Sequence, residues 1–445
     1  MPRRVVVTGI GAVTPFGVGI DALWEGLCSG KSALGPIESF DATGFRSSLG
    51  AEVKDFKGRD FVPKTYRKAV KVMARDTELA VAAAQCATEE AGLVTQGSSA
   101  HADDGAALTY APDRVGCQIG AGLIAAEVPE LAMAMATATE DGEFSYARWG
   151  TDDETGAGMD NLTPLWMLKY LPNMLACHVT IIHDAQGPSN TITCCEASGP
   201  LSIGESLRVI ERGDADVCFS GGVESKLNPM GLLRLDLTGV LAHTKPGDEA
   251  WTLVRPYDEG ATGTLVGEGG GILMVEGAEA AKSRGARAIC AIEGFGAGHT
   301  PASKDPERRA VGLEVAIEAA LKEAEIGPEK IDAIVPQGAG HRHADATEEA
   351  ALRRVLGERL RDIPLVTVTP QIGTLAAGAG AIGVCVGAKC LEQQKLPARL
   401  HAGTPVDGLD AGAADARDAD LEYMLVCTGA IGGQNAAIVL KRSAG

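Results

Sequence analysis

Short apolar runs alternate with longer amphipathic stretches along nearly the whole chain. The runs have the length and the Val-rich and Ile-rich composition of buried strands, whereas residues 76–92 and 312–324 carry apolar side chains at helical spacing. Strands alternating with helices form sheets whose faces are covered by those helices. The alternation therefore predicts an α/β layered fold with a largely buried sheet. The strand-like runs are residues 4–8, 115–120, 217–221, 271–275 and 333–335.

The later part of the chain echoes the earlier part. A second set of strand and helix signals runs from about residue 288 to the end, so we predict two similar α/β halves in one body, residues 1–280 and 281–445. Three further stretches carry charge without periodicity, which is typical of solvated loops. We expect surface insertions at residues 95–114, 139–161 and 405–420.

Composition excludes several classes of protein. With 445 residues, 45% of them hydrophobic, the chain can bury a large core. A net charge of −19 disfavours binding to nucleic acid or to an anionic membrane. The first residues enter a strand-like run directly and the apolar runs are short, which predicts a cytoplasmic protein without membrane insertion. Eleven cysteines in mostly apolar contexts favour reduced thiols, and no pair has zinc spacing, so neither a metal nor a cofactor is expected.

One segment has the pattern of a strand, a tight turn and a helix. Residues 187–199 read GPSNTITCCEASG, and apolar residues at helical spacing follow them. Turns of this kind present a nucleophile in several enzyme families, yet Glu196 occupies the turn here. A simpler interpretation is that Glu196 caps the helix, because acidic residues favour a first helical turn.

Several segments of the chain resemble the β-ketoacyl-acyl carrier protein synthase family. They occur in the order of that family, at close to its spacing, and span nearly the whole chain. The resemblance implies a thiolase-like fold with two related βαβαβαββ halves in a layered αβαβα body. It also implies a dimer and the extension of acyl chains by decarboxylative condensation on a carrier protein. The matching segments are residues 5–15, 187–189, 213–217, 255–258, 267–271 and 432–435.

The resemblance places Glu196 at the position of the family's cysteine nucleophile. Aligned without a gap, Cys194 and Cys195 lie two residues and one residue too early, before the turn that would present a side chain. A carboxylate, like a thiolate, is stabilised by a helix N-terminus, so Glu196 could stand in for the thiolate charge. It cannot form the thioester.

Both catalytic histidines of the family are also replaced. The family's His-Gly-Thr-Ser-Thr segment matches residues 337–341, so Gln337 takes the place of the first histidine. Its Gly-His-Leu segment matches residues 373–375, so Thr374 takes the place of the second. A lysine five positions earlier becomes Thr369, whereas its acidic partner is kept as Glu348. An unpaired buried carboxylate costs roughly 3–5 kcal/mol, so we expect other donors to have been recruited around Glu348.

Two further sites follow from the resemblance. The family's aromatic gate, Phe-Gly-Phe-Gly-Gly, matches residues 429–433, where Gly429 replaces a bulky side chain and so reshapes the cavity. Gly429, Ile431 and Thr264 are expected to line the substrate cavity. A basic ridge that docks the acidic carrier protein matches Lys64, Arg67 and Lys68, with Lys71, on a predicted helix; the alternative is a solvated helix face.

His341 and His343 need a separate interpretation. With Asp345 and Glu348 they have a spacing that metal sites tolerate, but we predict a loop here and favour an ordinary polar surface. A shift of the alignment by one step would instead make one of them the missing catalytic histidine. Gly338 and Asp345 align without any shift, which favours the unshifted register.

The whole pattern resembles the chain-length factor, a non-condensing subunit that pairs with a catalytic synthase in type II polyketide and polyene systems. Those subunits commonly carry Gln at the nucleophile position, so Glu196 is a departure. The leading hypothesis is a pseudoenzyme that forms a heterodimer with an active β-ketoacyl synthase and meets acyl carrier protein. Alternatives are an acyltransferase or malonyl decarboxylase that uses Glu196, condensation through Cys194 or Cys195, and a non-catalytic homodimer that binds acyl chains.

Overall fold

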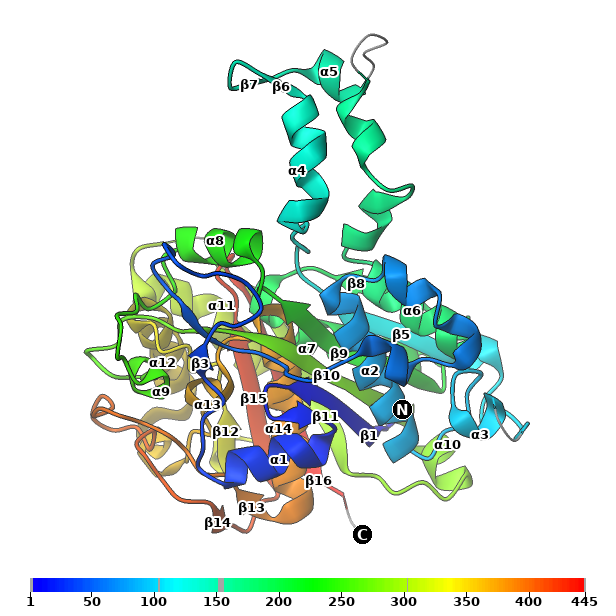
Figure 1. Ribbon diagram of the computed structural model, residues 1–445. Coiled ribbons are helices and arrows are strands. Elements are labelled where there is room, and N and C mark those ends of the chain that lie inside the picture. The colour runs from blue at the N-terminus through cyan, green and yellow to red at the C-terminus, as the bar shows by residue number, and fades with distance from the viewer. Residues whose placement is uncertain (1–2, 103–104, 151–155, 302, 444–445) are drawn as a thin grey trace.

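One large sheet runs through the body of the molecule, with helices on both of its faces (Figure 1). The computed structural model describes residues 3–102, 105–150, 156–301 and 303–443. The main strands, in their spatial order, are β12 (Ala333–Val335), β15 (Tyr423–Gly429), β16 (Gln434–Arg442), β11 (Cys290–His299), β1 (Val5–Thr14), β10 (Val266–Gly277), β9 (Val217–Ser225), β5 (Val115–Gly120) and β8 (Ser189–Ile192).

β1 lies near the centre of the sheet and every one of its residues is buried. Its β-branched side chains suit a strand that is covered on both faces. β1 pairs antiparallel with β10 on one side and with β11 on the other. At Gly269 of β10, φ is 129° and a β-carbon would lie 2.1 Å from the Val13 carbonyl oxygen, so only glycine lets the two strands approach here.

The two halves of the chain have the same strand order. In the first half β8 and β9 flank β5 in parallel, and then β9, β10 and β1 follow one another antiparallel. In the second half β12 is parallel to β15, and β15, β16 and β11 follow antiparallel. A parallel bridge from Ile334 to Leu365 takes the place of β8. The prediction of two similar α/β halves is confirmed, and the predicted division after residue 280 falls inside α10 (Ala278–Ser283).

The helices form three layers: one lies between the two halves of the molecule, and one covers the outer side of each half. α7 (Ser198–Glu211) and α14 (Ala379–Gln393) pack against each other between the halves, so residues 380–391 of α14 are all buried. Gly199 permits this approach, since a β-carbon there would lie 2.8 Å from the Ala381 β-carbon. α2 (Arg75–Glu90) with α6 (Met174–His183) covers the first half, and α11 (Pro306–Glu323) with α12 (Arg342–Leu356) covers the second.

Shorter elements complete the described chain. The helices are α1 (Ile20–Cys28), α3 (Ser99–Ala102), α8 (Pro229–Leu237), α9 (Ala250–Leu253) and α13 (Thr369–Ile372). The strands are β2 (Gly17–Val18), β3 (Gly35–Pro36), β4 (Leu49–Ala51), β13 (Lys395–Leu396) and β14 (Arg417–Asp418). None of the described helices combines the length and the apolar character that a membrane span requires.

An arm projects from the body between β5 and α6 (Figure 1). We define the arm as residues 123–170; it holds α4 (Val128–Thr137), β6 (Thr139–Glu140), β7 (Glu143–Phe144), α5 (Tyr146–Gly150) and single 3-10 turns. The predicted insertion at residues 139–161 is therefore too short. Where the structure describes it, most of this stretch is regular structure and not a loop. Residues 151–155 lie outside the described chain. The cause is α4, whose apolar residues the predicted insertion left out.

The other two predicted loops are closer to the structure. The stretch 95–114 contains α3 and one 3-10 turn, Pro112–Arg114, and residues 103 and 104 lie outside the described chain. The stretch 405–420 is irregular apart from β14.

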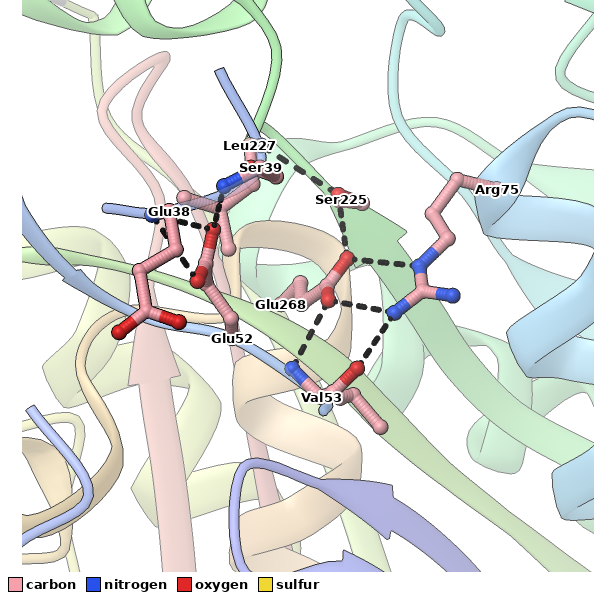
Figure 2. Close-up of polar contacts among 8 residues, drawn as sticks. All are labelled: Glu38, Ser39, Glu52, Val53, Arg75, Ser225, Leu227 and Glu268. Carbon is pink, nitrogen blue, oxygen red and sulfur yellow. Dashed lines mark hydrogen bonds and ion pairs between the residues drawn. The ribbon is translucent and has the colours of Figure 1, made fainter. Parts of the chain in front are cut away.

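A buried carboxylate fastens the start of β10 to its neighbours. Figure 2 shows Glu268 accepting hydrogen bonds from the Val53 N–H at 2.9 Å, the Ser225 hydroxyl at 2.9 Å and the Arg75 guanidinium at 2.8 Å. Arg75 also donates to the Val53 carbonyl at 2.8 Å. The network joins β10, β9 and Arg75, the first residue of α2. It therefore fixes the position of the chain just after the basic segment 64–71.

Candidate functional site

Glu196 lies at the junction predicted for it. β8 ends at Ile192, the 3-10 turn Cys195–Ala197 follows, and α7 begins directly at Ser198. The Glu196 Oε2 accepts a hydrogen bond from the Ile431 N–H at 3.4 Å, across 235 residues of sequence. Burial raises the pKa of Glu196, while hydrogen bonds from its own N–H and from the Ile431 N–H oppose that rise.

A cavity of about 230 Å³ joins this turn to the second half of the chain. It brings together three residues that the resemblance placed at the nucleophile and histidine positions: Glu196, Gln337 and Thr374. Four other predicted residues, Glu348, Thr264, Gly429 and Ile431, line the same cavity. These residues are separated by up to 235 positions in the sequence, and the strand order of the two halves collects them at one place.

Gln337 follows β12, and its side chain reaches the loop between β15 and β16. Its Oε1 accepts a hydrogen bond from the Gly429 N–H at 3.0 Å. Thr369 is buried behind it and donates its hydroxyl to the Gln337 carbonyl at 3.1 Å. Gln337, Thr369 and Thr374 also line a second cavity of about 30 Å³. Thr369 therefore contacts the backbone of Gln337 and does not line the main cavity.

Glu348 accepts hydrogen bonds from several uncharged donors. The Tyr257 hydroxyl donates to it at 2.7 Å, and the N–H groups of Gln337 and Gly338 donate at 2.9 and 3.0 Å. The Cys427 thiol adds a longer contact of 3.7 Å. Burial raises the pKa of Glu348 and these donors oppose the rise. Donors other than a lysine therefore surround Glu348, and their recruitment in place of a lysine stays a prediction.

The segment with His341 and His343 is helical, so the predicted loop is wrong. α12 begins at Arg342, and His341 caps it by accepting the Ala344 N–H at its Nδ1, at 3.4 Å. Asp345 turns inward and accepts the N–H groups of Tyr257 at 3.0 Å and Ala339 at 2.8 Å. Burial raises the pKa of Asp345 to about 8. Within the described residues, no His, Cys, Asp and Glu side chains form a group that could hold a metal ion.

Arg309 is a cavity residue that the sequence did not indicate. It comes from α11, lines the cavity, and its nearest hydrogen-bond acceptor is the Ile431 carbonyl at 3.5 Å. Glu196 thus accepts the N–H of Ile431, and Arg309 donates to the carbonyl of the same residue. No motif points to Arg309, since it is one of several charged residues on an amphipathic helix and only the fold brings it to the cavity.

Cys194 and Cys195 are not among the residues that line the cavity. Cys195 is exposed, with φ at 48°, and its pKa is raised to about 11 by partial burial and by the carboxylates of Glu196 and Glu224. Burial also raises the pKa of Cys194. Both environments disfavour the thiolate that a cysteine nucleophile requires.

The basic residues lie on the surface, away from the cavity. Lys64, Arg67, Lys68 and Lys71 are all exposed. The predicted helix is wrong, because the segment consists of two 3-10 turns, Lys64–Tyr66 and Ala69–Val72. Val62 and Met73 are buried on either side of the segment.

Comparisons with known proteins agree with this architecture. The family description "Beta-ketoacyl synthase, N-terminal domain" matches residues 2–281, and "Beta-ketoacyl synthase, C-terminal domain" matches residues 289–403. The 3-oxoacyl-[acyl-carrier-protein] synthase 2 of Staphylococcus aureus is 29% identical over 444 residues, which cover 99% of this chain and 98% of that protein.

Two solved structures are similar over the same length. "The ishigamide ketosynthase/chain length factor" has a TM-score of 0.81 and 27% identity, covering 100% of both chains. A β-ketoacyl synthase from Burkholderia phymatum has a TM-score of 0.82 and 25% identity, covering 99% of this chain and 100% of that one. The fold is therefore thiolase-like, as predicted. With both family descriptions matched in order, this chain belongs to the β-ketoacyl synthase family.

Proposed function

We propose that this chain is a non-condensing subunit of the chain-length-factor type, which pairs with an active β-ketoacyl synthase and helps to define its acyl tunnel. One observation carries the proposal: the side chains gathered in the cavity at the nucleophile and histidine positions are Glu196, Gln337 and Thr374. A carboxylate cannot hold an acyl chain as a thioester. An amide and a hydroxyl cannot replace two imidazoles as proton-transfer groups at neutral pH.

The hydrogen bonds of Glu196 support a subunit without turnover. Two converging N–H groups, its own and that of Ile431, stabilise its carboxylate. Converging backbone N–H groups are the donors that acyl-transfer enzymes use for a developing oxyanion. Here the protein's own carboxylate engages them. This favours the subunit over an acyltransferase or decarboxylase that uses Glu196, because those reactions need the donors free for substrate.

Exposed apolar side chains on the arm support a partner. Tyr146 is 85% exposed, Leu165 72%, Met167 66% and Met133 63%. Large apolar patches of this kind on a soluble protein usually mark an interaction surface. β8, a strand of four residues, also ends the described sheet and offers its outer edge for pairing. A second copy of this chain would cover the same surfaces in the homodimer alternative.

Acyl carrier protein is the second proposed partner. The Staphylococcus aureus relative is named as a synthase of acyl-carrier-protein substrates. On this chain, Lys64, Arg67 and Lys68 are exposed within a molecule of net charge −19. A local basic ridge on an acidic protein would steer an acidic carrier to one place by electrostatic attraction.

An acylation and turnover assay on the purified chain tests the proposal. The chain is mixed with acyl-carrier and malonyl-carrier substrates, and intact mass and carbon dioxide release are followed. The proposal predicts no acylated protein and no decarboxylation, in the wild type and in Glu196→Ala alike. The Staphylococcus aureus relative serves as the reference synthase. Turnover by the wild type that disappears in Glu196→Ala would overturn the proposal in favour of altered chemistry.

A further inference from the structure

One guanidinium and two imidazole side chains share the cavity with Glu196. Arg309 comes from α11, and His341 and His343 come from the start of α12. Among the described residues, no carboxylate forms an ion pair with the Arg309 guanidinium. Glu307 and Glu314, which flank Arg309 on α11, pair with Arg354 instead, at 2.5 and 2.8 Å. The closest acceptor recorded for Arg309 is the Ile431 carbonyl at the long distance of 3.5 Å.

The cap of α12 orients His341. Because its Nδ1 accepts the Ala344 N–H, the proton of the neutral ring is assigned to Nε2, which leaves one donor free. His343 lies two residues further on and is half-buried at the cavity. The pKa of His341 is lowered by burial and by the nearby His343 and Arg309, as expected where positive charge is concentrated without a counter-ion.

The acidic residues of the cavity are already satisfied by other groups. Asp345 accepts the N–H groups of Tyr257 and Ala339, and Glu348 accepts the Tyr257 hydroxyl and two further N–H groups. Glu196 accepts the Ile431 N–H. Burial raises the pKa of all three carboxyl groups, to about 8 for Asp345, and the hydrogen bonds that they accept oppose the rise.

We propose that Arg309, His341 and His343 form an anion site that binds the carboxylate or phosphate group of an acyl-type ligand in this cavity. Leu235, Val240 and Leu313 supply apolar lining beside the three polar groups, so a short aliphatic chain and an anionic head are both accommodated. A free carboxylic acid and a phosphate ester would present the same anionic oxygens. The site does not depend on which partner subunit the chain binds.

Calorimetric titrations of the full chain with hexanoate, inorganic phosphate and the neutral analogue hexanol test the site at pH 6 and pH 8. At least one anion should bind, and should bind more tightly at pH 6 than at pH 8, because a bound anion opposes the lowering of the His341 pKa and so favours uptake of a proton. Preference for hexanoate identifies a carboxylic acid, and preference for phosphate identifies a phosphate ester. Hexanol binding as tight as hexanoate would overturn the site, as would no anion binding below about 10 mM.

Matched variants assign the binding to these residues. Arg309→Gln should weaken anion binding about tenfold or more, the range of a charge-assisted hydrogen bond. Arg308→Gln, at an exposed position next to it on α11, should leave binding unchanged. His341→Asn keeps a helix cap but removes the imidazole, so with His343→Gln it should weaken the pH dependence; the remainder is expected from Asp345, whose pKa is raised to about 8. Wild-type affinity in Arg309→Gln would overturn the proposal even if the anion binds.

Discussion

At the scale of single residues, the cavity shows how uncharged donors stabilise a buried carboxyl group. Thr369 stands where the resemblance expects a lysine, and the buried Glu348 now depends on the Tyr257 hydroxyl at 2.7 Å and on backbone N–H groups. Tyr257 is itself only 2% exposed. The hydroxyl is therefore a structural donor in a place where no water competes for it.

Replacing Tyr257 with phenylalanine tests this compensation. Tyr257→Phe removes the hydroxyl with little change in shape and leaves a buried carboxylate oxygen without that donor. We expect the free energy of unfolding, measured by urea titration, to fall by about 1–3 kcal/mol. Tyr146→Phe is the control, since Tyr146 is 85% exposed. Equal stability of the two variants would show that the backbone donors alone satisfy Glu348.

The residues of the cavity differ in how far the sequence reveals them. Ungapped alignment to a known motif places Glu196, Gln337 and Thr374, and the structure brings all three to one cavity. Tyr257 lies in the matched segment 255–258, but its contact with Glu348 does not follow from that motif, and no local pattern points to Arg309. Each lies far along the chain from the group it contacts, so its role depends on tertiary packing, which a motif does not encode.

At the scale of elements, most of the predicted strands and helices lie where the structure has them, but the predicted first and last residues are less accurate. The strand at residues 333–335 is β12, whereas β10 begins at Val266, five residues before its predicted start. Glycines fill that missing part of β10, and glycine is a poor strand signal on its own. α12 was missed at its start because few apolar residues mark its first turns, where His341 acts as the cap.

The arm is the element on which the partner proposal makes its sharpest prediction. Charged substitutions at Met133, Leu165 and Met167, each to Glu, should reduce association with the partner subunit by at least tenfold, because they place a charge in a desolvated contact. Circular dichroism should be unchanged, since all three side chains are exposed. The control is Val315→Glu, at a 47% exposed position on α11. A complex that survives the arm substitutions but not the control would refute the assigned interface.

The basic ridge makes a separate prediction about carrier protein. Reversing Lys64, Arg67 and Lys68 to Glu should slow association with acyl carrier protein, because electrostatic steering is lost. Wild-type association should weaken as salt rises, and the triple variant should lack that dependence. Surface plasmon resonance measures both. Lys330→Glu, at another exposed position, is the control, and an equal effect of that change would show that net charge alone matters.

At the scale of the whole molecule, the residues that line the cavity are different from the residues of the main hydrophobic core. The two halves share one strand order, and their central helices α7 and α14 begin close to Glu196 and Thr374 respectively. The residues that build the central layer are apolar and distinct from those that line the cavity. Under the proposed function, replacement of the reacting side chains would leave the architecture intact and allow a subunit to keep the family's shape without its reaction.

Affinity purification of the tagged chain from its native host, followed by condensation assays on the recovered complex and on the chain alone, tests this account most directly. The account predicts recovery, in equal amounts, of a synthase that carries the cysteine and both histidines, with condensation only in the complex. A stable homodimer that recovers no such synthase, or turnover of malonyl-carrier substrate by the chain alone, would contradict it.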